Sequence, residues 1–91
     1  MIDVVLMPGI ILPVALRYAP LLRALGSGVR AVAKELEVYA ADAPPAGYSI
    51  RREVEGVARA ADAAGFERFH LYGHSGGGAS ALAFAAAHAD R

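Results

Sequence analysis

The sequence predicts an α/β fold with a parallel sheet, and three observations support this. Short β-branched and apolar runs alternate with longer segments of helical periodicity. Glycine or proline marks most changes from one kind of segment to the next. The length of 91 residues is enough for one small domain and too short for two. Since strands that alternate with helices pair in parallel and carry helices on both faces, we expect one three-layer α/β/α domain over residues 1–91.

The first half of the chain contains two expected strands with a helix between them. Asp3–Met7 is a short apolar run that stops at a Pro-Gly turn signal. Val14–Leu25 carries leucines at helical spacing, contains one proline and ends at glycines, which stop a helix. Val29–Ala33 alternates apolar residues with an arginine and is the second expected strand. Residues 36–39 fit either the end of this strand or the loop that follows it.

The second half continues the alternation. Ser49 is a suitable N-cap for an amphipathic helix over Ile50–Ala64, and Gly65 is its stop signal. Phe66–Tyr72 is the third expected strand, and Ala79–His88 is a helix of small apolar residues that suits close packing on a sheet. The arginines and acids of the first of these helices are expected on its solvated face. Its buried face is expected to contain Ile50, Val54, Val57, Ala58 and Ala61.

Composition excludes several classes of function. Hydrophobic residues make up 56% of the chain and charged residues 20%, so the chain is more apolar than the average soluble domain, and disorder of the whole chain is excluded. Nine basic and nine acidic residues leave no net charge and no basic stripe, which argues against a nucleic-acid partner. The absence of cysteine excludes disulfide scaffolds, cysteine-based zinc sites and thiol nucleophiles.

No segment suits a membrane span or a secretory signal. The most apolar opening stretch, Val4–Leu16, is interrupted by two prolines and a glycine and falls short of the roughly 18 apolar residues that a spanning helix needs. The residues before it include an acid and no lysine or arginine, unlike a secretory signal. We therefore expect no membrane association and a cytoplasmic location.

The segment with the clearest chemistry lies between the third expected strand and the last expected helix. Its Gly73, Ser75 and Gly77 fit the pattern G-x-S-x-G. A serine at such a sharp turn has a strained backbone, and the residues two before and two after it crowd together unless they lack side chains. The strain exposes the serine oxygen. The helix that starts there directs the free N–H of Gly76 toward a developing oxyanion.

At this point the sequence resembles the α/β-hydrolase family. Val4-Val-Leu-Met-Pro-Gly9 is similar to the family's central strand and the loop after it, and His70–Ala85 is similar to its nucleophile strand, elbow and next helix. The resemblance covers nearly the whole chain and implies that Ser75 is the nucleophile of a serine hydrolase. It also implies a second oxyanion donor in the loop after the first strand, by position the N–H of Ile10. A proline precedes Gly9 where many members have histidine, but a backbone donor does not depend on that side chain.

The rest of the catalytic triad departs from the family's pattern. In this family the acid and then the histidine follow the serine along the chain. Here His88 precedes Asp90, and roughly 20 Å of helix separates His88 from Ser75. We therefore expect an incomplete, apparently truncated hydrolase domain without its general base. No metal or organic cofactor is implied.

Two nucleotide-binding motifs compete with the hydrolase interpretation. The spacing of Gly73 and Gly78 fits a P-loop, but Ala79 replaces the lysine that contacts the phosphates. A dinucleotide fingerprint also fits the glycines, without the acidic residue expected about 20 positions later. The first hypothesis is thus a serine hydrolase that acts on an ester or related carbonyl substrate through an acyl-enzyme. The alternative is a catalytically inert fragment, or an α/β module that binds a small ligand or nucleotide.

The remaining polar residues are expected to be structural. His74 is expected to project away from Ser75, His70 to be partly buried inside the third strand, and Asp42 to serve a turn or a cap. A small molecule is the expected substrate. Because three strands leave two unpaired sheet edges, we also expect self-association or pairing with a complementary chain.

Overall fold

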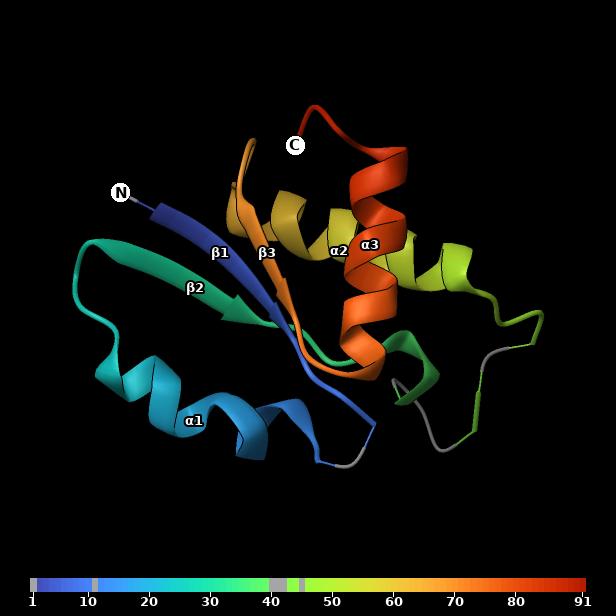
Figure 1. The fold of residues 1–91 in the computed structure, drawn as a ribbon, viewed down its shortest axis with the longest axis horizontal. Helices are drawn as coiled ribbons and strands as arrows, with labels where there is room; N and C mark the ends of the chain where they lie inside the picture. The colour runs from blue at the N-terminus through green and yellow to red at the C-terminus, as the bar shows by residue number, and fades with distance from the viewer. Residues whose placement is uncertain (1, 11, 40–42, 45) are drawn as a thin grey trace.

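The computed structural model describes residues 2–10, 12–39, 43, 44 and 46–91, and this part of the chain confirms the α/β class. Three strands alternate with three helices in it (Figure 1). The helices are α1 (Val14–Ala24), α2 (Ile50–Ala64) and α3 (Gly76–Ala87). A 3₁₀ turn at Glu37–Tyr39 occupies the segment that the sequence assigned to either strand or loop. None of the helices described is both long and apolar enough to cross a membrane.

The sheet is parallel throughout, with the first strand in its centre. β1 (Ile2–Met7) lies between β2 (Val29–Ala33) and β3 (His70–Gly73). The run of apolar residues in β1 suits this position, because the central strand of a parallel sheet is buried on both faces. β2 and β3 each pair on one side only within the described residues, so both outer edges of the sheet are unpaired there.

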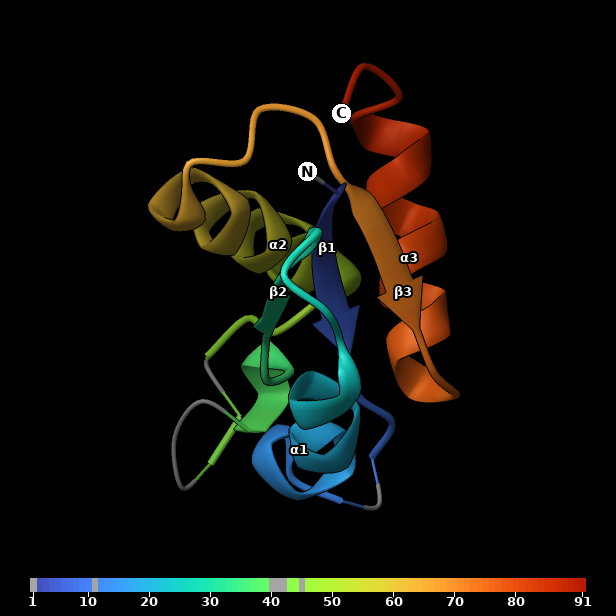
Figure 2. The same ribbon diagram turned by 90° about the vertical axis from the view of Figure 1, so that its left-hand side faces the viewer.

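The hydrophobic core lies between the sheet and the two later helices (Figures 1 and 2). Val5 of β1, Val57 of α2 and Phe84 of α3 are almost inaccessible to solvent in this core. Ile50 departs from the predicted buried face, since it is 49% exposed. It is the first residue of α2, and Figure 1 shows that this end of the helix extends past the sheet.

The third strand is shorter than the sequence predicts. The prediction covers Phe66–Tyr72, whereas β3 begins at His70. Phe66 is buried, and its N–H donates to the Ala61 carbonyl at 2.8 Å, so this segment is bonded to the end of α2 and not to the sheet. The prediction that His70 is partly buried is also wrong, because His70 is exposed at the start of the shorter strand.

Glu53 of α2 is a buried carboxylate in a place where the sequence predicts a solvated charge. Its exposed fraction is 1%. It accepts the N–H of Glu37 at 2.8 Å, the N–H of Val38 at 3.2 Å and the hydroxyl of Tyr48 at 2.5 Å. Buried carboxylates need such donors, because an unpaired buried charge is strongly unfavourable. Glu53 therefore anchors the 3₁₀ turn and the loop before α2 to the helix.

The hydrogen bond between Tyr48 and Glu53 predicts a loss of stability at alkaline pH. Burial and the adjacent Glu53 carboxylate raise the pKa of Tyr48 from 10.0 to about 12. Because the folded pKa is above the unfolded one, this contribution is fully present below pH 10 and is lost as the pH rises to about 12. Urea unfolding should therefore show a smaller alkaline decline for Tyr48→Phe than for the unsubstituted chain. Equal declines in the two proteins would contradict the assignment.

Candidate functional site

Ser75 lies between β3 and α3 in a strained backbone conformation. Its φ is 53° and its ψ is −119°, and no other non-glycine residue of the described part has a positive φ. Such a conformation costs on the order of 1–3 kcal/mol and persists only where the surrounding structure enforces it. α3 begins at Gly76, earlier than the Ala79 start that the sequence predicts, so the helix follows directly on the serine. Ser75 is exposed to solvent.

Two glycines make this turn sterically possible. A Cβ on Gly73 would overlap the carbonyl of Gly77 and lie 2.9 Å from the Cα of Gly78. A Cβ on Gly77 would overlap the carbonyl oxygen of Pro8 and lie 2.9 Å from that of Met7. The crowding around the serine therefore includes the loop after β1 as well as the two turn residues. Both contacts are with backbone atoms, which cannot move aside cheaply.

The loop after β1 lies against the start of α3. The Met7 carbonyl accepts the N–H of His74 at 3.2 Å and the hydroxyl of Tyr18 at 2.5 Å, so β1, the serine turn and α1 are joined at one atom. The Cγ2 of Ile10 lies 3.1 Å from the position of a Cβ on Gly76. Within the described residues, neither the Ile10 nor the Gly76 N–H donates to another protein group. Both residues therefore lie close to Ser75, and their N–H groups have no partner among the described residues.

Ser75 opens into a pocket of about 190 Å³. This volume is below the roughly 300–1,000 Å³ typical of pockets for drug-sized ligands, so it suits a small group. Most of the wall is apolar, and one cation contributes to it. The residues that form it are Gly9, Ile10, Leu12, Arg17, His74 and Ser75.

No base for Ser75 is in place in the described part of the chain. His74 is exposed and lines the same pocket, but no hydrogen bond joins it to Ser75. His88 follows the far end of α3 and stacks on Phe84, with ring centroids 4.8 Å apart. At about 1.5 Å per residue, α3 holds this imidazole far beyond hydrogen-bond reach of the serine. Asp42 lies outside the described residues.

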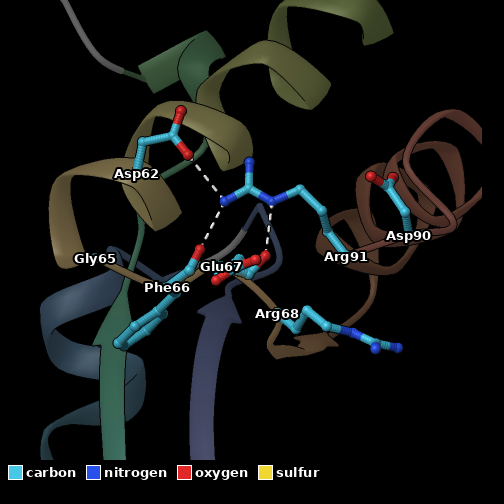
Figure 3. Close-up of a pocket in the computed structure, with 7 residues that line it drawn as sticks. All are labelled: Asp62, Gly65, Phe66, Glu67, Arg68, Asp90 and Arg91. Carbon is cyan, nitrogen blue, oxygen red and sulfur yellow. Dashed lines mark hydrogen bonds and ion pairs between the residues drawn. The ribbon is translucent and has the colours of Figure 1, made fainter.

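A larger hollow of about 490 Å³ lies at the opposite end of the sheet, around Arg91 (Figure 3). The Arg91 guanidinium donates to the carbonyls of Phe66 at 2.6 Å and Glu67 at 3.0 Å, and pairs with Asp62 at 2.8 Å. These bonds tie the residues after α3 to the segment before β3. Because Arg91 is already bonded to protein groups and joins two segments here, this hollow is a structural junction, and the Ser75 pocket is the stronger candidate site.

Two N–H groups of the glycine-rich segment are used within the turn itself. Gly76–Gly78 make the first turn of α3, where the N–H of Gly77 donates to the His74 carbonyl at 2.9 Å and that of Gly78 to the Ser75 carbonyl at 2.8 Å. Phosphate-binding loops instead present such N–H groups to the ligand. Their use within the turn argues against both nucleotide motifs. Across the described residues, no group of three or more His, Cys, Asp or Glu side chains is arranged to hold a metal ion.

Arg17 is the site residue that sequence reasoning missed. It lies inside a segment of ordinary helical periodicity, where an arginine gives no functional signal. The order of the elements could have indicated it, because α1 follows directly on the loop that contains Ile10. A side chain one turn into that helix is then close to whatever the loop binds.

No protein-family model matches the chain, and neither a curated protein nor a solved structure matches it. The interpretation of the site therefore depends on its geometry.

Proposed function

We propose that the chain has an α/β-hydrolase type of fold and acts as a serine hydrolase on an ester or related carbonyl substrate. The observation that carries this proposal is the positive φ of Ser75 at a strand-to-helix turn, between two glycines whose missing side chains permit it. This is the conformation of a nucleophile elbow, in which strain presents a serine oxygen above a sheet. A cytoplasmic location accompanies this proposal.

The strand order supports both the fold and the place of the site. β1 is followed by its neighbour on one side, β2, and the chain then crosses to the other side of β1 to form β3. Right-handed crossovers in opposite directions would put α1 and α2 on opposite faces, and the three-layer arrangement is part of this proposal. Ligands of such sheets bind at the carboxyl ends of the strands where the order reverses. The Ser75 pocket lies there, between the residues after β1 and those after β3.

The site's own groups can carry out most of an acyl transfer. The Ser75 oxygen would bond to the carbonyl carbon, and the carbonyl electron pair would move onto its oxygen, held by the N–H groups of Gly76 and Ile10. Collapse of this intermediate would expel the alcohol, and water would then release the acid and restore the serine. The serine proton requires a base, and the described residues do not bring the histidine and acid of a triad together at the pocket.

The absence of an assembled base among the described residues favours one alternative, a catalytically inert module that binds a small ligand in this pocket. A serine without a base is a weak nucleophile at neutral pH, and the residual contribution of an oxyanion hole is modest. Self-association, or pairing with a complementary chain along the edges of β2 and β3, is a further proposal. Both edges would accept another strand.

Labelling with a fluorophosphonate separates the hydrolase from the inert module. We expect the chain to form one covalent adduct, in which the Ser75 oxygen bonds to phosphorus and fluoride leaves. Ser75→Ala should abolish the adduct, whereas Ser27→Ala, which alters an exposed serine distant from the turn, should retain it. Mass spectrometry of the intact chain measures both. Absence of any adduct on the unsubstituted chain would contradict the hydrolase and support the inert module.

A further inference from the structure

One of the residues that line the mostly apolar Ser75 pocket carries a positive charge. Arg17 is the cation of the wall, and its neighbours there include Gly9, Ile10 and Leu12. A guanidinium is costly to desolvate, and a pocket that binds only apolar groups gains nothing from one. An arginine near the serine therefore favours a ligand that carries a negative charge.

Arg17 is not neutralised by an acid in the described part of the chain. The ion pairs found there involve four other cations, Arg30, Lys34, Arg59 and Arg91. Glu35 lines a neighbouring hollow together with Ile10 and Leu12. Its two carboxylate oxygens accept the backbone N–H groups of Val14 at 2.9 Å and Leu36 at 3.0 Å. That carboxylate is already used to hold the start of α1. Among the described residues, none accepts a hydrogen bond from the donors of Arg17.

The arginine is also held in place. Its guanidinium carbon lies over the ring of Tyr18, 5.5 Å from the centroid. Tyr18 is itself buried, donates to the Met7 carbonyl at 2.5 Å and meets the ring of Tyr72 edge-on, with centroids 6.2 Å apart. The ring that the guanidinium contacts is therefore tied to the ends of β1 and β3, which also position Ser75. A fixed guanidinium loses less freedom on binding than a free one.

We propose that the Ser75 pocket binds short acyl groups that end in a carboxylate, and that Arg17 is the specificity-determining residue that binds this carboxylate. The planar guanidinium matches a carboxylate with two parallel hydrogen bonds. The pocket volume of about 190 Å³ limits the acyl chain to a few carbons. The inference rests on the proposed function, because it assigns the acyl group that the Ser75 oxygen would attack.

The first test measures binding in the Ser75→Ala background, in which Ser75 cannot cleave the ester. Monomethyl succinate carries the carboxylate, and dimethyl succinate is its neutral counterpart. We expect NMR titration to show that Arg17→Gln weakens binding of the monoester by about ten- to a hundredfold, the range for loss of charge-assisted hydrogen bonds. Arg17→Lys should give an intermediate loss of monoester affinity, because lysine keeps the charge but cannot form the two parallel hydrogen bonds of a guanidinium. Arg23→Gln, which removes an exposed charge from the same helix, should have no effect.

The second test compares two fluorophosphonates of equal length, one ending in a carboxylate and one in a methyl ester. The unsubstituted chain should label faster with the carboxylate probe, and Arg17→Gln should bring the ratio of the two labelling rates close to one. Arg23→Gln should leave that ratio unchanged. If the neutral probe labels Ser75 but Arg17→Gln changes neither monoester binding nor the preference between probes, this inference fails and the hydrolase proposal stands. If neither probe labels Ser75 while monoester binding still depends on Arg17, the hydrolase proposal fails and the carboxylate site stands. Monoester binding that is equal with and without Arg17→Gln would overturn the carboxylate site.

Discussion

Gly77→Ala is expected to destabilise the chain by at least about 3 kcal/mol. The added methyl group would overlap the Pro8 carbonyl oxygen and lie 2.9 Å from the Met7 carbonyl oxygen. Both belong to the buried junction between β1 and the serine turn, so relief requires α3 or the central strand to move. The total stability of a domain of this size is roughly 5–14 kcal/mol, so this loss is a large part of it.

Gly78→Ala is the matched control, because it adds the same methyl group to the next residue of the same helix. The nearest atom to a Cβ there is the carbonyl oxygen of Gly73 at 3.7 Å, an ordinary contact. Alanine is favoured over glycine inside a helix by roughly 0.5–1 kcal/mol, so this variant should match or exceed the stability of the unsubstituted chain. Urea unfolding of the three proteins measures the difference. Equal midpoints for the two variants would show that the contact of α3 with β1 is not as close as described.

Local signals were sufficient to predict most elements of the fold. β2 and α2 have the predicted bounds. Gly65 ends α2 in the left-handed conformation, with a φ of 77°, as the glycine at this position predicted. The strained turn at Ser75 was predictable for the same reason. The spacing of Gly73 and Gly77 around the serine encodes a steric requirement that acts within a few residues.

Features that depend on distant partners could not be predicted. Phe66 begins an apolar run typical of a strand, but the carbonyl of Ala61 binds its N–H and the strand starts later. Helical periodicity places charges outside, and it contains no information about the donors that surround Glu53. Arg17 belongs to the same class, since its position at the pocket follows from how α1 packs on the end of β1.

Glu53→Ala should be the second strongly destabilising substitution, with an expected loss of about 3 kcal/mol. It would remove the acceptor for the N–H groups of Glu37 and Val38 and for the Tyr48 hydroxyl, and would leave a void beside them. Unsatisfied donors at a buried position cost their full desolvation energy, which exceeds the net value of the bonds themselves. The 3₁₀ turn should therefore detach from α2 before the sheet unfolds.

Glu55→Ala provides the comparison, because it removes the same side chain from an exposed position of the same helix. A surface substitution of this kind usually changes stability by less than about 0.5 kcal/mol. Thermal unfolding measures the two losses, and hydrogen exchange at the amides of Glu37 and Val38 reports on the turn directly. We expect those two amides to exchange much faster in Glu53→Ala alone. Since Glu35, two residues before Glu37, holds the N–H of Val14 at the start of α1, a detached turn should also loosen the helix that positions Arg17.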